Sequence, residues 1–81
     1  MTGKVKDVSV YENYLYDLGI LIREMAVESK LAATQKQTDF ATGYMDGFHR
    51  IVSLMQQQAK AFDIPLENIG LDGIDPDVDL V

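Results

Sequence analysis

The stretch from Val8 to Lys36 repeats apolar residues at helical spacing on two opposite sides, and this pattern constrains the fold more than any other feature. Gly19 is the one residue of note in it that disfavours a helix. A helix that is apolar on two sides has to be covered on two sides. The broader stripe, which we expect to form the core, consists of Tyr11, Tyr14, Leu15, Leu18, Leu21, Ile22, Met25 and Ala32. The opposite stripe consists of Tyr16, Ile20, Val27 and Leu31.

A second helix is predicted from about residue 38 to residue 62, and its apolar residues cover a broad arc of roughly 200°. The middle of this arc, which we expect to be buried, holds Phe40, Tyr44, Phe48, Ile51, Met55 and Phe62. Met45, Val52 and Ala59 widen it on one side, and Gly43, Gly47, Leu54 and Ala61 widen it on the other.

The segment between the two helices reads TQKQTD and contains neither glycine nor proline, so one continuous helix is an alternative. The phase of the apolar stripes argues against it, because at about 100° per residue the second stripe is roughly 90° out of register with the first. Thr38 or Asp39 can serve as an N-cap. We therefore predict a turn near residues 36–39 and an all-α antiparallel hairpin.

The tail, residues 63–81, follows the helix-ending pair Ile64–Pro65 and carries all of the net charge. It contains six acids and no base, whereas seven bases balance seven acids before it, which gives the net charge of −6. Pro65 can open a short helical turn, and a further turn is expected to start at Asp75. Because apolar residues recur along the tail, at least residues 64–74 should pack on the helices.

Residues 1–81 should form one domain whose core is small, because a chain of this length buries only roughly 60–65% of its unfolded surface. We therefore expect a homodimer that pairs two hairpins in a four-helix bundle. One hairpin does not cover both stripes of the first helix, so the second stripe is assigned to the interface, with residues 64–80 of the tail as the alternative cover. The predicted interface residues are Tyr16, Ile20, Val27, Leu31, Gly43 and Gly47.

Gly43 and Gly47 lie one helical turn apart, and each costs about 1 kcal/mol relative to alanine inside a helix. Close approach of another helix would offset that cost. The alternative is that the rings of Tyr44 and Phe48 need the space. We expect leucine at Gly47 to disrupt packing, and alanine at Gly19 to be tolerated better.

The sequence gives little basis for metal or cofactor binding, and none is predicted. The only histidine, His49, follows Asp46 by three residues, as in half of a di-iron site, but both fall on the polar side of the second helix. The alternating Asp75, Asp77 and Asp79 resemble the start of a calcium loop, yet the chain ends before the loop would be complete.

Catalysis is not predicted either. The chain has no cysteine and therefore no disulfide, thiolate nucleophile or zinc–thiolate site, and it has no glycine-rich phosphate loop. No tight E-x-x-E or E-x-x-D pair occurs among the acids of the first helix, which are Glu12, Asp17, Glu24 and Glu28.

The predicted function is that of a small non-enzymatic regulatory or adaptor protein with an unidentified protein partner. The last seven residues alternate acidic with apolar side chains, a pattern suited to extended, edge-strand-like binding. The residues assigned to partner binding are Asp75, Asp77, Val78, Asp79 and Leu80. One alternative is a metal- or nucleotide-binding enzyme assembled across a dimer; another is an acidic mimic of nucleic acid that blocks a basic groove.

The remaining expectations concern nucleic-acid binding, membrane association and cellular location. The acidic balance and scattered bases argue against general nucleic-acid binding. The first 13 residues lack the apolar run of a signal peptide, and no stretch has the roughly 18–20 apolar residues of a membrane span. We therefore expect a cytoplasmic protein without membrane association.

Overall fold

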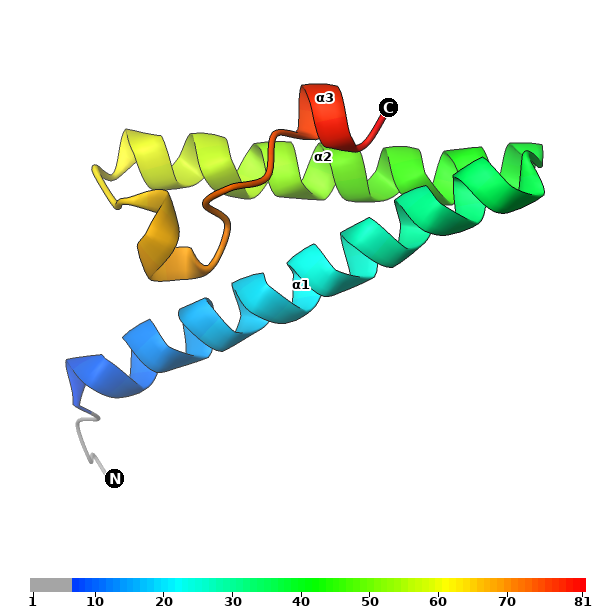
Figure 1. Cartoon of the computed structure of the whole chain (residues 1–81). Coiled ribbons are helices and arrows are strands. Elements are labelled where there is room, and N and C mark those ends of the chain that lie inside the picture. The colour runs from blue at the N-terminus through cyan, green and yellow to red at the C-terminus, as the bar shows by residue number, and fades with distance from the viewer. Residues whose placement is uncertain (1–6) are drawn as a thin grey trace.

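The computed structural model describes residues 7–81 as two long antiparallel helices with the tail folded against them (Figure 1). Residues 1–6, part of the segment in which no signal peptide is expected, lie outside the described residues. Helix α1 spans Val8–Lys36 and helix α2 spans Asp39–Ala61. The prediction of an all-α hairpin is therefore confirmed.

The break between the helices lies where the sequence predicted it. Gln37 adopts the left-handed conformation, with φ of 52°, and its N–H donates to the Ala33 carbonyl at 3.1 Å. Thr38 is extended, and its hydroxyl accepts the Ala41 N–H at 3.1 Å, which caps the first turn of α2. These two residues reverse the chain and exclude one continuous helix.

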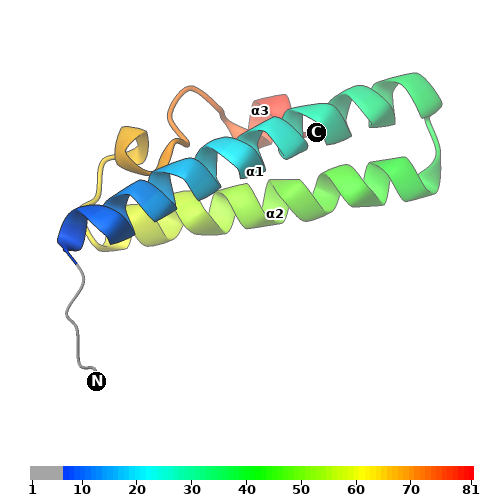
Figure 2. The same ribbon diagram turned by 90° about the horizontal axis from the view of Figure 1, so that it is seen from below.

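The tail runs back along one side of the hairpin (Figures 1 and 2). Its first element is η1, a 3₁₀-helix at Leu66–Ile69 that begins directly after Pro65, as expected. Its second is α3, a single turn at Pro76–Asp79 that is capped by the Asp75 carboxylate. In Figure 2 the long helices lie side by side and the tail lies along one side of them.

The core forms between the tail and the groove of the hairpin, and the tail supplies most of its large side chains. The prediction that residues 64–74 pack on the helices is confirmed. The buried apolar residues are Ile69, Leu71, Ile74 and Leu80 from the tail, Ala26 from α1, and Ala41, Met45, Val52 and Ala59 from α2. The helices therefore face the tail mainly with small or flank residues.

The predicted core stripes of both helices are largely exposed in the single chain, although Ile22, Phe48 and Met55 pack against the core as predicted. In α1 the exposed members, each at least 40% accessible, are Tyr11, Tyr14, Leu15, Leu21 and Met25. In α2 they are Phe40, Tyr44, Ile51 and Phe62, each at least 44% accessible. The physical reason is that the tail occupies the groove and turns each helix so that its small-residue flank faces inward.

Backbone contact between α1 and the tail fixes this arrangement. A Cβ atom at Gly19 would lie 1.6 Å from the Ile69 carbonyl oxygen, so only glycine fits there. Gly70 has φ of +69°, and a Cβ atom on it would lie 2.9 Å from the Ile20 nitrogen and the Tyr16 oxygen. The expectation that alanine is tolerated at Gly19 is therefore wrong.

We predict that Gly19→Ala lowers the free energy of unfolding by about 1–3 kcal/mol, because the added methyl group forces the tail away from α1. Thr34→Ala is the control, since Thr34 is an exposed residue of the same helix. Thermal unfolding followed by circular dichroism should show a loss of stability in the first variant alone. Equal stability of the two variants would contradict the contact.

Candidate functional site: an uncovered apolar face

The side of the hairpin away from the tail is apolar and uncovered, and we call it the open face. Its side chains come from the stripes that the sequence assigned to the core. At 100° per residue they project from each helix on the side opposite the residues that contact the tail. The open face comprises Tyr14, Leu21 and Met25 from α1, and Phe40, Tyr44, Ile51, Leu54 and Phe62 from α2.

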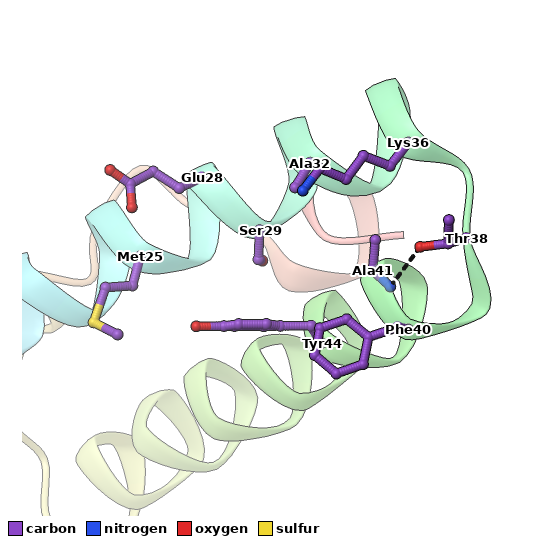
Figure 3. Close-up of a pocket in the computed structure, with 9 residues that line it drawn as sticks. All are labelled: Met25, Glu28, Ser29, Ala32, Lys36, Thr38, Phe40, Ala41 and Tyr44. Carbon is purple, nitrogen blue, oxygen red and sulfur yellow. Dashed lines mark hydrogen bonds between the residues drawn. The ribbon is translucent and has the colours of Figure 1, made fainter.

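Both helices contribute to this face near the turn, where a hollow is lined by both of them. This hollow, of about 310 Å³, lies between Met25 and Ala32 of α1 and Tyr44 of α2. Figure 3 shows the Tyr44 ring extending toward the Met25 side chain. Near the other end, a smaller hollow of about 160 Å³ lies between Leu15 and Phe62, and Ile64 and Ile69 of the tail also line it. Near the turn, the open face is therefore one surface rather than two separate stripes.

Aromatic rings form a row on α2 at this face. The rings of Phe40 and Tyr44 meet edge to face, with centroids 6.3 Å apart, and those of Tyr44 and Phe48 stack with centroids 5.3 Å apart. Scattered apolar side chains are normal on a protein surface, whereas a contiguous patch of large ones marks an interaction site. The row is therefore the main candidate anchor for a partner.

The dimensions of the chain show that it is thin and elongated. Its radius of gyration is 15.1 Å, compared with about 12 Å for a compact domain of this length. Its extents of 50 × 26 × 15 Å describe a thin slab. A slab has two broad sides, and the tail covers only one of them.

The second stripe of α1, which the sequence assigned to a dimer interface, is partly covered by the tail. Gly70 packs against Ile20, which is half-buried. Tyr16, Val27 and Leu31 remain exposed. The tail is thus a cover for one end of this stripe and leaves the other end free.

Gly43 and Gly47 have open space beside them. A Cβ atom on either would meet no atom of a residue beyond its chain neighbours within 4 Å. Both lie on the part of α2 that adjoins Phe40 and Leu54. No close approach within residues 7–81 explains these glycines, and their assignment to an interface between chains stays a prediction.

Polar contacts hold the tail to the helices. The Gln56 amide donates hydrogen bonds to the carbonyls of Leu71, at 3.0 Å, and Ile74, at 2.8 Å. It thereby satisfies two backbone groups of the tail. At the C-terminal end, the Lys30 ammonium group donates to the backbone oxygen of Val81. Gln56 could not be identified from the sequence, because on a helical wheel it belongs to the polar arc.

The end of the tail is not the extended segment that the sequence predicted. Residues 76–79 form α3, and Leu80 is only 1% exposed, so it belongs to the core and is not displayed to a partner. Asp75, Asp77 and Asp79 are exposed, as is Val78. The helical turn thus presents its acids while its last apolar residue anchors it.

We predict that Leu80→Ala destabilises the chain by about 2–5 kcal/mol, the usual cost of truncating a buried leucine. Val78→Ala should change stability by no more than about 0.5 kcal/mol, since Val78 is 68% exposed. Denaturant unfolding measures both. Similar midpoints for the two variants would show that the end of the tail does not pack as described.

His49 reaches the tail rather than Asp46. Its Nε2 atom lies 2.9 Å from the Asp77 carboxylate, so it links α2 to α3. Within residues 7–81 no three His, Cys, Asp or Glu side chains are grouped closely enough to hold a metal ion. In the same part of the chain, neither long helix is apolar enough over sufficient length to cross a membrane.

We predict that His49→Ala leaves helicity and oligomeric state intact and lowers stability by less than about 1 kcal/mol, because Asp77 is exposed and the pair is weakly coupled. Circular dichroism and sedimentation measure these quantities. Elemental analysis of the protein purified without chelator provides the further check: stoichiometric metal that is lost in this variant would contradict the absence of a metal centre.

No protein-family model, curated protein or solved structure matches this chain. Function is therefore inferred from the surfaces themselves.

Proposed function

We propose that this chain is a non-enzymatic protein-interaction protein of regulatory or adaptor type that works as a homodimer. The observation that carries the proposal is the open face, which exposes large apolar side chains on both long helices. Pairing two open faces would bury them and make a bundle of four long helices, two from each copy.

The size of the face supports a stable pair. A stable interface buries about 800 Å² on each partner. The two longer dimensions of the whole chain are 50 and 26 Å, which leaves room for an interface of that size on one side. Its aromatic residues are of the type that dominates binding energy when buried at the centre of an interface.

The exposed acids of α3 form the second surface of the proposal. Asp75, Asp77 and Asp79 are exposed, as is Val78. The carboxylates of Asp75 and Asp79 each accept one backbone N–H of this segment, and Asp77 contacts His49. Since no base occurs in residues 63–81, this surface favours a basic protein partner and disfavours nucleic acid. We place the protein in the cytoplasm, in keeping with its lack of cysteine.

We predict that Leu21→Lys converts the dimer to a monomer, whereas Leu31→Lys leaves it intact. The two leucines form a matched pair, since they lie on the same helix and are 55% and 57% exposed. Leu21 belongs to the open face and Leu31 to the second stripe. Burying an unpaired ammonium group in an interface is strongly unfavourable, so only the variant within the true interface should dissociate.

Sedimentation equilibrium of the wild-type chain and both variants measures the result. A wild-type monomer at high concentration would overturn the proposal. A dimer that Leu31→Lys dissociates and Leu21→Lys does not would move the interface to the second stripe.

A further inference from the structure

The two outer edges of the open face differ in charge. On α1, the side turned away from α2 carries Asp17, Glu24 and Glu28 within an arc of roughly 40°. The corresponding side of α2 carries Arg50 together with Asp39 and Asp46. One edge therefore carries three acids and no base, whereas the other carries two acids and one base.

Arg50, Glu24 and Glu28 have no ionic partner among the described residues. The ion pairs formed within residues 7–81 join Arg23 to Asp72 and His49 to Asp77. The side chains of both edges are exposed and therefore accessible to a second molecule.

Two-fold symmetry allows the open faces of two copies to meet in two ways. If the axis runs along the helices, each α1 lies on the partner's α2, and the acidic edge of one copy meets the Arg50 edge of the other. If the axis runs across the helices, each α1 lies on the partner's α1, and the two acidic edges meet. Like charges placed opposite each other suppress the second arrangement.

Counting residues from the turn at Gln37 gives the position of each residue along the hairpin axis, which we call its level. Glu24 precedes Gln37 by 13 residues and Arg50 follows it by 13 residues, so the two stand level with each other. An axis along the helices preserves level, which brings Arg50 of one copy beside Glu24 and Glu28 of the other. By symmetry this pairing occurs twice in the dimer.

The small residues agree with this arrangement. Ala32 lies five residues before Gln37 and Gly43 lies six residues after it, so Gly43 of one copy stands nearly level with Ala32 of its partner. Ala32 lines the hollow near the turn, and Gly43 has open space beside it. Two small residues at this crossing would let the helix backbones approach closely.

The geometry points to a dimer in which each α1 packs on the partner's α2 and Arg50 forms ion pairs with Glu24 and Glu28 across the interface. This inference rests on the proposed homodimer and specifies its partner surface. It assigns roles to three charged residues and explains why glycine stands at position 43.

Charge reversal tests the arrangement by sedimentation at low salt, with circular dichroism to confirm that each variant is folded. Arg50→Glu and Glu24→Arg should each raise the dimer dissociation constant by about 3–10-fold, since each places like charges together twice. The double variant should recover most of the wild-type affinity. High salt should reduce the differences.

If α1 instead packs on the partner's α1, Glu24→Arg lowers the dissociation constant rather than raising it, because it relieves the repulsion between the two acidic edges. That result overturns the inference while the homodimer stands. A wild-type chain that does not dimerise overturns the proposed function itself. The two failures are therefore distinguishable in one set of measurements.

Cross-linking gives a second test that does not depend on ion pairs. The chain has no cysteine, so single cysteines can be introduced without competing thiols. Mixing the Ala32→Cys and Gly43→Cys chains under mild oxidation should give mainly the covalent heterodimer. Preferential cross-linking of either variant to itself would contradict the arrangement.

Discussion

The contact between Gly19 and the backbone of Ile69 and Gly70 is the constraint on which the rest of the structure depends. Because neither glycine carries a Cβ atom, the tail backbone approaches the α1 backbone directly. That approach places Leu71 and Ile74 in the groove between the long helices, where the Gln56 amide binds their carbonyls. The tail is thus part of the core rather than an appendage.

Because the tail packs on one side of the hairpin, the large side chains on the other side are exposed. Side chains from the tail fill the groove, so the helices turn small or flank residues such as Ala26 and Ala59 inward. Their larger side chains, including Tyr14 and Tyr44, then project from the opposite side. Within residues 7–81 no other segment covers them, and this is the basis for proposing a second copy as the occupant.

The sequence predicted both helices, the turn at Gln37 and the packing of residues 64–74, because each depends on local signals such as periodicity, capping and proline. It failed on which face is buried. A helical wheel identifies the face with the largest apolar side chains. Which face is buried, however, depends on where the tail packs. Leu80 was misassigned for a related reason, since alternation in a short segment does not distinguish an extended strand from one helical turn.

The central claim is that the open face is covered by a second copy, and the concentration dependence of thermal unfolding tests it most directly. Unfolding of a dimer produces two chains, so mass action stabilises the folded state as concentration rises. The account predicts that the midpoint increases by about 4 °C for each tenfold increase in protein concentration. A midpoint that does not change with concentration would show that the chain folds alone with its open face in water.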